Sequence, residues 1–183
     1  VALLDESFRR YADRMAYKFM GRAISFREVD QASAALAGWL QSRGLARGDR
    51  VAVMMPNVPQ YPVAIAAILR AGLVVVNVNP LYTPRELEHQ LKDSGAKAIV
   101  IFENFATTLQ QVLHEVPTRH IVLTAMGDMM GAMDITMLAP YLMSIFGSTD
   151  GAEGLGALVG LDTSSLSELA LEGGGSFEIR LEA

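Results

Sequence analysis

Short apolar runs alternate with segments of helical periodicity over the first two-thirds of the chain. Four of the runs are too short to be helices, and helical patterns separate them. We predict that they are strands of one largely parallel sheet: Val51–Met55, Leu73–Asn77, Ala98–Phe102 and Ile121–Leu123. Continuous apolar runs are typical of strands buried on both faces. The pattern therefore predicts an α/β fold, with a mostly parallel sheet flanked by helices.

Two capping boxes indicate where helices begin. Ser25 and Glu28 are spaced so that each side chain can satisfy a free backbone donor of the other residue. Thr83 and Glu86 repeat this spacing, with Pro84 at the first helical position, where a missing N–H does little harm. We expect the helix after Ser25 to bury one stripe of residues: Val29, Ala32, Leu36, Trp39 and Leu40.

Other segments of the first 125 residues give weaker patterns. An N-terminal helix would place Leu4, Phe8, Tyr11 and Met15 on one face. Two extended pieces around Gly21 predict a small hairpin. Residues 57–72 are apolar almost all round and predict a buried helix, and residues 105–116 predict an amphipathic one. We also expect the run that ends at Asn77 to be a buried strand.

The pattern changes after Thr124. Six of the ten methionines lie within residues 126–146, and the residues from Asp150 onward are rich in Gly, Leu, Ala and Glu. We therefore divide the chain into an α/β N-terminal subdomain, residues 1–125, and an atypical Met- and Gly-rich tail, residues 126–183. Because few caps and turns specify the tail, we expect limited proteolysis to cut between residues 126 and 175 and to spare the first 125 residues.

Composition narrows the class of protein. Hydrophobic residues make up 51% of the chain, which is enough for a buried core, and the net charge of −5 argues against a nucleic-acid partner. No cysteine is present, so disulfides and thiolate metal sites are excluded. No run of apolar residues is long enough to cross a membrane, and no signal peptide is visible. We expect a cytoplasmic protein, with peripheral membrane contact as an open alternative.

A series of motifs in fixed order resembles the N-terminal part of the AMP-forming acyl-CoA synthetases. The motifs are Gly44-Leu45, Gly48-Asp49-Arg50-Val51-Ala52, Pro56-Asn57, Gly72 and the segment NPLYTPREL at residues 79–87. The sequence of residues 79–100 is most similar to bacterial long-chain fatty acid–CoA ligases. The resemblance covers residues 1 to about 128, and many spaced matches agree.

This resemblance implies a reaction in two steps. A fatty acid carboxylate attacks the α-phosphate of Mg·ATP and gives acyl-adenylate and pyrophosphate, and the coenzyme A thiol then displaces AMP. The resemblance thus implies ATP, Mg and coenzyme A as cofactors and fatty acid as substrate of the full-length family. Such chemistry needs a phosphate-binding loop with a lysine, an acidic Mg ligand and positive charge near the developing negative oxygens.

The family's reactive elements are absent from this sequence. The phosphate loop of the pattern T-S-G-T-T-G-x-P-K-G is missing, as are the later aspartate for the ribose and the C-terminal lysine. Phe146–Asp150 resembles the family's aromatic-Gly-x-Thr-acid element, but we interpret it as a polar turn because it follows the α/β unit almost directly. We therefore assign no catalytic residue and no metal ligand, leave the cofactor-binding residues and oligomeric state unknown, and expect this chain to be inactive alone.

Several other residues invite a functional interpretation. Gly154–Gly160 loosely resembles a dinucleotide-binding loop, yet no strand precedes it, so we favour a flexible segment. Asp49 is interpreted as a turn residue that orients the next strand. Ser25 and Thr83 have capping roles and are not expected to be nucleophiles. The three histidines, His89, His114 and His120, share no ligand spacing and are expected at the surface or at element boundaries.

Two other classes of function remain open. A truncated, fused or frame-shifted product could keep an α/β fold as a non-catalytic scaffold or interaction module. A small dinucleotide-binding domain is the third alternative, and it depends on the Gly-rich tail alone. The source sequence around residues 125–183 would discriminate between these alternatives.

Overall fold

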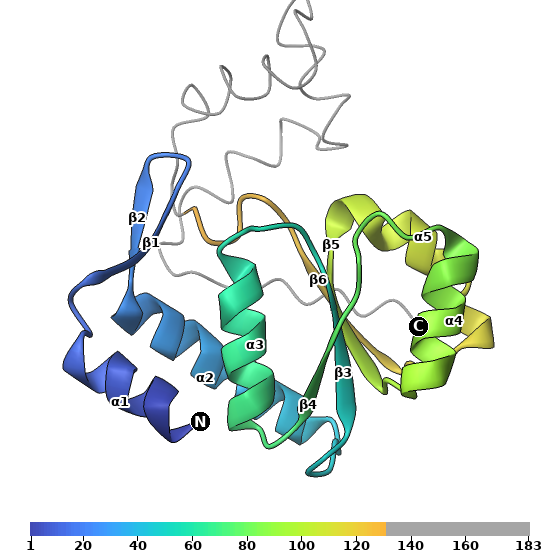
Figure 1. Ribbon diagram of the computed structural model, residues 1–183, viewed down its shortest axis with the longest axis horizontal. Coiled ribbons are helices and arrows are strands. Elements are labelled where there is room, and N and C mark those ends of the chain that lie inside the picture. Colours follow the sequence, from blue (N-terminus) through green and yellow to red (C-terminus); the bar gives the residue numbers. More distant parts are fainter. Residues whose placement is uncertain (131–183) are drawn as a thin grey trace, which may run out of the picture. The chain divides into compact units, whose positions relative to one another are not determined.

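The computed structural model describes residues 1–130, so the expectations for the tail beyond them lie outside the described residues (Figure 1). The elements begin with a helix, a hairpin and a long helix: α1 (Ala2–Arg10), β1 (Met15–Phe19), β2 (Arg22–Ser25) and α2 (Phe26–Ser42). The sheet and its helices follow: β3 (Arg50–Met54), α3 (Gln60–Arg70), β4 (Val74–Asn77), α4 (Pro84–Ser94), β5 (Ala98–Phe102), η1 (Glu103–Phe105), α5 (Ala106–Gln110), η2 (Leu113–Glu115) and β6 (His120–Thr124).

The four predicted strands form one parallel sheet in the order β4-β3-β5-β6. Val51 pairs with Val75 on one side and with Ala98 on the other, so β3 lies between β4 and β5. The prediction of a largely parallel sheet is confirmed, with strand ends that differ from the expected ones by one residue at most. The hairpin around Gly21 is also confirmed, because β1 and β2 pair antiparallel.

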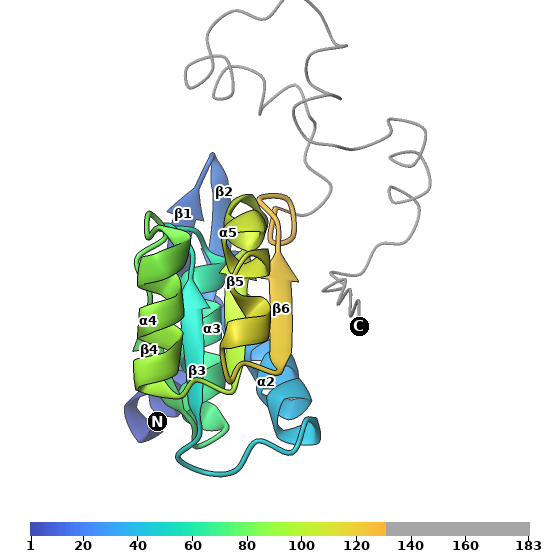
Figure 2. The ribbon, with the colours of Figure 1, turned by 90° about the vertical axis from the view of Figure 1, so that its right-hand side faces the viewer.

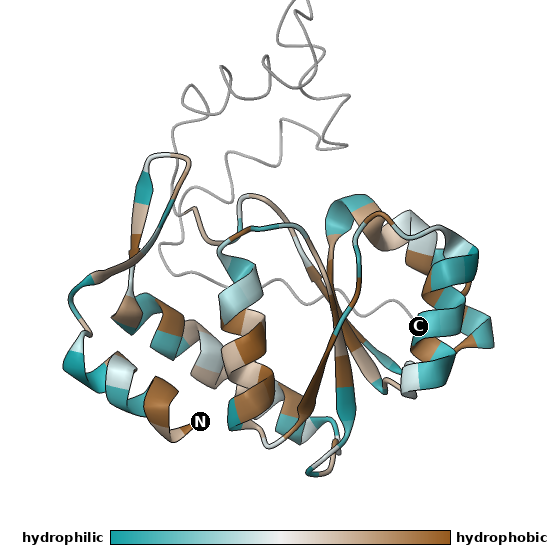
Figure 3. Ribbon diagram, in the orientation of Figure 1, coloured by the Kyte–Doolittle hydropathy of each residue, from teal (hydrophilic) through white to brown (hydrophobic). Residues whose placement is uncertain are grey.

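Helices cover both faces of this sheet (Figures 1 and 2). On one face α2 and α3 pack against Val51, Val53 and Val100. On the other face α4 and the α5 region pack against Ala52 and Ile99. The faces alternate along each strand because successive side chains point to opposite sides. Figure 3 shows α3 as largely hydrophobic and α4 as mostly hydrophilic, because α3 packs against both the sheet and α2.

Both capping boxes form as predicted. The Ser25 hydroxyl accepts from the Glu28 backbone N–H, and the Glu28 carboxylate accepts from the Ser25 backbone N–H at 2.7 Å. The Thr83–Glu86 pair repeats this arrangement at the start of α4, with a backbone-to-carboxylate distance of 2.8 Å. Each box satisfies donors that the first helical turn leaves without an intrahelical partner. The local sequence therefore fixes where α2 and α4 begin.

The expectation of a fully buried strand at β4 is wrong. β4 lies at one edge of the sheet formed by the described residues, and the side chain of Val74 is 44% exposed. Leu73, which precedes the strand, is buried, whereas Val75 and Val76 are only half-buried. An apolar run indicates a strand, but its place within the sheet depends on strand order, which hydrophobicity alone does not specify.

Two predicted helices are shorter than expected. α1 ends at Arg10, and Met15 belongs to β1 instead of the helical face. The chain turns here because residues 12–14 pair with the start of α2, where the Phe26 and Arg27 N–H groups donate to backbone carbonyls. The predicted helix at residues 105–116 is broken into α5 and flanking 3-10 turns, in a stretch that contains the β-branched pair Thr107 and Thr108.

The predicted stripe of α2 is correct in part. Val29, Leu36 and Leu40 are buried as expected, whereas Ala32 and Trp39 are half-buried. The remaining buried positions of the helix are Ser33 and Ala37. Within residues 1–130 no helix is both long enough and apolar enough to span a membrane.

Candidate functional site

The carboxyl ends of β3 and β5 mark the place where this topology favours a ligand. From β3 the chain passes through α3 to β4, and it then passes through α4 to β5 on the opposite side of β3. The direction of winding therefore reverses between β3 and β5. Open α/β sheets bind their ligands outside the carboxyl ends of the strands at such a switch point.

The first turn of α3 braces this end of the sheet. The Gln60 side chain donates from Nε2 to the carbonyl oxygen of Ala125, just after β6, at 2.7 Å. The Tyr61 hydroxyl donates to Oδ1 of Asn77, the last residue of β4, at 2.8 Å. Two consecutive residues thus connect α3 to the two opposite edge strands of the described sheet.

Gln60 is unusual because it is polar and nearly fully buried, with 3% of its surface exposed. Its Nε2 group is paired with Ala125, whereas its Oε1 atom has no hydrogen-bond partner among the described residues. A buried acceptor without a donor is costly, so such an atom calls for an explanation. Sequence reasoning missed Gln60, because the only sign of it is one polar residue in an otherwise apolar helix.

The polar side chains around these strand ends do not suit a nucleotide triphosphate. The strand ends and the residues just after them carry amides and a single carboxylate, at Asn57, Asn77, Asn79 and Glu103, and the exposed Arg85 in the first turn of α4 is a lone cation. A triphosphate needs cations or a cradle of backbone N–H groups, and Mg²⁺ needs clustered oxygen ligands. Among residues 1–130 no cluster of three potential metal-ligating side chains occurs. The described residues therefore do not fit ATP or Mg²⁺.

Asp49 lies at the opposite, amino end of the sheet. Its carboxylate accepts from the Ala46 N–H at 2.8 Å and forms an ion pair with Lys97 at the same distance. The hydrogen bond from Lys97 and then the one from Ala46 lower the pKa of Asp49. Asp49 thus holds the turn before β3, as expected from the sequence.

The three histidines stand on separate elements. His89 lies on α4, His114 on η2 and His120 at the start of β6. His89 and His114 are exposed, and His120 is half-buried. Ser25 and Thr83 are engaged in their capping boxes. Of these residues, the structure brings Thr83 and His89 together, in one shallow pocket at the start of α4.

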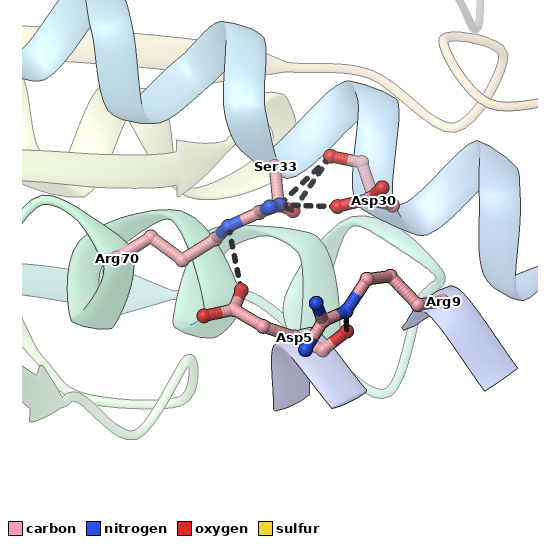
Figure 4. A network of polar contacts seen from close by, with 5 residues as sticks. All are labelled: Asp5, Arg9, Asp30, Ser33 and Arg70. Atoms are coloured by element: carbon pink, nitrogen blue, oxygen red, sulfur yellow. Dashed lines mark hydrogen bonds and ion pairs between the residues drawn. The ribbon is translucent and has the colours of Figure 1, made fainter. Parts of the chain in front are cut away.

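A second polar cluster joins α1, α2 and α3 around Arg70 (Figure 4). Nη1 of Arg70 lies 2.7 Å from Oδ1 of Asp30 and donates to the Ser33 hydroxyl at 2.8 Å. Nε of Arg70 lies 3.5 Å from the Asp5 carboxylate, and the guanidinium stands over the ring of Phe8. A planar guanidinium can serve several acceptors at once. Arg70 therefore fixes the position of α1 on the other two helices.

The comparison with protein families identifies the fold. The model of the family described as AMP-binding enzyme matches residues 4–137. The long-chain-fatty-acid–CoA ligase of Escherichia coli O157:H7 is 54% identical over 139 residues, which cover 75% of this chain and 25% of that protein. The ligase of the same name from Bacillus subtilis is 41% identical over 102 residues, covering 56% of this chain and 18% of that protein.

Solved structures show the same arrangement of elements. A long-chain-fatty-acid–CoA ligase from Archaeoglobus fulgidus has a TM-score of 0.60 and 25% identity, and the match covers 66% of this chain and 26% of that one. The anthranilate CoA ligase AuaEII, with a TM-score of 0.64, 21% identity and coverage of 67% and 24%, shares the fold. The chain spans about a quarter of the length of the curated relative from Escherichia coli. It belongs to the family of AMP-binding enzymes.

Proposed function

We propose that this chain is the N-terminal portion of a long-chain fatty acid–CoA ligase, which activates a fatty acid by adenylation and then transfers the acyl group to coenzyme A. The observation that carries the proposal is the 54% identity to a ligase of that name over three-quarters of this chain. Identity at that level supports the view that the matched residues play the same role in both proteins. ATP, Mg²⁺, coenzyme A and a fatty acid would be the partners of the full-length enzyme.

The part of the enzyme that this chain supplies is structural. Its residues build four strands and brace their carboxyl ends through Gln60 and Tyr61. The lysine-bearing phosphate loop of the family is absent from the sequence. Electrostatic stabilisation of the transferring phosphoryl group needs such charges, and the described amides at the strand ends do not replace them. We infer that the chain catalyses neither half-reaction alone.

A non-catalytic scaffold is the second candidate. The observation that favours it is that residues 1–130 hold no cluster of three potential metal-ligating side chains. A parent gene that carries the phosphate loop further along would support the ligase. A stop codon directly after Ala183 in the source sequence would support the scaffold.

We further propose a cytoplasmic location with peripheral membrane contact. The lack of cysteine fits a reducing compartment, and a long-chain fatty acid is a substrate that partitions into membranes. Fractionation of cells that express the chain tests this proposal. Recovery in the soluble and peripheral membrane fractions supports it, and recovery only as an integral membrane protein contradicts it.

Pyrophosphate release tests the inference that this chain alone does not catalyse adenylation. The purified 183-residue chain, mixed with ATP, Mg²⁺ and a long-chain fatty acid, should release no pyrophosphate above background. The matched control is a complete long-chain fatty acid–CoA ligase under the same conditions, which shows that the assay detects the reaction. Release by the chain that depends on fatty acid would show that it holds a complete site and would contradict the proposal.

A further inference from the structure

Three basic residues stand side by side at the amino edge of the sheet. Arg50 begins β3, Lys97 directly precedes β5, and Arg119 directly precedes β6. The Lys97 N–H donates to the carbonyl oxygen of Arg50 at 2.9 Å, and the Arg119 N–H donates to that of Lys97 at 2.8 Å. We name these three residues the amino-edge cation row. Neighbouring strands lie about 4.8 Å apart, so the row spans about 10 Å.

The side chains of the row project from one face of the sheet. The next position along the three strands holds Val51, Ala98 and His120, which pair in that order across the sheet. Val51 and Ala98 pack toward α2 and α3. Because successive side chains of a strand point to opposite faces, the cation row lies on the side of the sheet that α4 covers. Nη1 of Arg50 accordingly stands beside Gly95, the C-cap of α4.

The row is exposed and only partly neutralised. All three of its side chains are exposed to solvent. Lys97 forms an ion pair with the half-buried Asp49, and Nη1 of Arg119 donates to a carbonyl oxygen at 3.2 Å. Within residues 1–130 the Arg50 guanidinium has neither an ion pair nor a hydrogen bond. The row therefore presents three positive charges against one paired carboxylate.

The end of α4 does not account for the charge at Arg50. Carbonyl groups at the C-terminus of a helix attract cations. In α4, however, the Gly95 N–H already donates to the carbonyl oxygens of Leu91 and Lys92, at 3.0 and 3.3 Å. Gly95 has a left-handed φ of 63°, which closes the helix through its own backbone. The guanidinium of Arg50 is thus available to a ligand.

An exposed apolar residue extends the row at one end. Val74 of β4 pairs with Arg50 in the parallel ladder, so it lies at the same level and on the same face. Its side chain is 44% exposed, which is unusual for a valine within a sheet. Across the four strands the line therefore reads one valine and then three cations, over about 14 Å.

This line matches one face of an acidic helix. We propose that the amino-edge cation row and Val74 bind an acidic amphipathic helix of a partner protein. Residues three or four apart on a helix have Cβ atoms about 5–6 Å apart, which is close to the spacing of the strands. Carboxylates at positions i, i+4 and i+7 cover about 10 Å of the helix axis, and an apolar residue at i+11 reaches toward Val74.

Other anionic partners fit this surface less well. Binding to a bilayer uses a broad apolar face beside the cations, whereas Val74 is the single exposed apolar side chain of this line. A nucleic acid demands an extended basic surface, and the chain carries a net charge of −5. The row is short and regularly spaced, so a short segment with carboxylates at helical spacing suits it best. This proposal does not depend on the ligase function proposed above.

Binding of a synthetic helix to the 183-residue chain tests the proposal. The probe is an alanine-rich peptide with Glu at positions i, i+4 and i+7 and Leu at i+11. The control peptide has the same composition, with the three Glu residues distributed around the helix. In nitrogen–proton correlation spectra the probe should shift the amide signals of Arg50, Lys97 and Arg119. We expect it to bind about fivefold more tightly than the control peptide, and less tightly as salt is raised.

Variants of the row localise the contact. Arg50→Gln should weaken binding of the probe by up to about fivefold, because it removes the unpaired cation. Arg85→Gln is the matched control, since the exposed Arg85 stands in the first turn of α4 and outside the row, and it should bind as the wild type does. Val74→Thr should weaken binding of the probe but not that of a peptide with Ala in place of Leu. Unfolding midpoints check that each variant is folded.

The proposal is overturned if the two peptides bind equally, if the shifted signals lie outside the row and its neighbours, or if folded Arg50→Gln binds as the wild type does. Tighter binding to anionic vesicles or to a short DNA duplex than to the probe, at equal salt, would also overturn it. Should Val74→Thr fail to fold, the peptide pair and the arginine pair still decide. Because no ATP, fatty acid or coenzyme A is used, failure here leaves the ligase assignment intact.

Discussion

The Gln60 side chain donates from Nε2 to the carbonyl oxygen of Ala125 at 2.7 Å and so joins two positions 65 residues apart in the sequence. Gln60 stands in the first turn of α3, and Ala125 follows the last strand of the sheet. The bond therefore connects the first helix after β3 with the exit from β6.

Replacement of Gln60 should destabilise the fold through this contact. Gln60→Met is isosteric and removes the donor, so we expect a loss of about 1–2 kcal/mol of unfolding free energy. Gln60→Glu should cost more at pH 7, because it places a buried carboxylate against a carbonyl oxygen. The loss of unfolding free energy in Gln60→Glu should be smaller at acidic pH, where the protonated carboxyl group can donate to the Ala125 carbonyl oxygen. Urea unfolding at pH 7 and pH 5 measures both effects.

The matched controls for Gln60 are Gln110→Met and Gln110→Glu on α5. Gln110 is exposed, so both changes should alter the unfolding free energy by less than about 0.5 kcal/mol. If Gln60→Met is as stable as the wild type, the contact with Ala125 contributes nothing and the bracing of the strand ends is wrong.

Arg70 should resist replacement by lysine. Arg70→Lys keeps the charge but loses the planar group whose Nη1 serves Asp30 and Ser33 while its Nε faces Asp5, and we expect a loss of about 1–2 kcal/mol. Arg70→Met should cost more, because it also leaves the half-buried Asp5 and Asp30 without their cation. Arg85→Lys, at an exposed position of α4, is the control and should be neutral. Thermal or urea unfolding that shows Arg70→Lys to be as stable as the wild type would contradict this role.

The capping carboxylates predict how stability depends on pH. Hydrogen bonding to the backbone of Thr83 lowers the pKa of Glu86 below its ordinary 4.5, and the backbone of Ser25 does the same for Glu28. A group whose pKa is depressed on folding stabilises the protein above its unfolded pKa, and this contribution is lost as pH falls through the folded value. Unfolding free energy should therefore decline as the pH drops below about 4.5.

Thr83→Ala paired with Glu86→Gln isolates this effect. The double variant removes the titrating carboxylate and its hydroxyl partner, so its stability should fall less steeply with acid than that of the wild type. Glu6→Gln, at an exposed position of α1, is the control and should keep the wild-type slope. If the unfolding free energies of the double variant and the wild type fall equally with pH between pH 6 and pH 3, titration of Glu86 does not contribute to stability.

Local sequence specified some features of this fold and left others open. The capping boxes at Ser25 and Thr83 and the four apolar runs are short-range signals, and the structure confirms them. The edge position of Val74 was not predictable, because strand order is a property of the whole sheet. Tertiary pairing also overrode local pattern near Met15, where turn contacts with α2 end the helical face early.

The candidate site was harder to anticipate than the fold. Gln60 and Ala125 are far apart in sequence, so no local pattern indicates their bond. The family resemblance carried by residues 79–87 indicated the reaction class, but it did not indicate these residues.

The central claim is that this chain can serve as the N-terminal quarter of a long-chain fatty acid–CoA ligase. Its most direct test is an exchange, in which residues 1–128 replace the aligned segment of the Escherichia coli ligase to which the chain is 54% identical. The same ligase with that segment deleted is the control. We predict that the chimera forms fatty acyl-CoA in a reaction that depends on ATP, whereas the deleted enzyme does not. A soluble, folded chimera with no more activity than the deleted enzyme would contradict the claim.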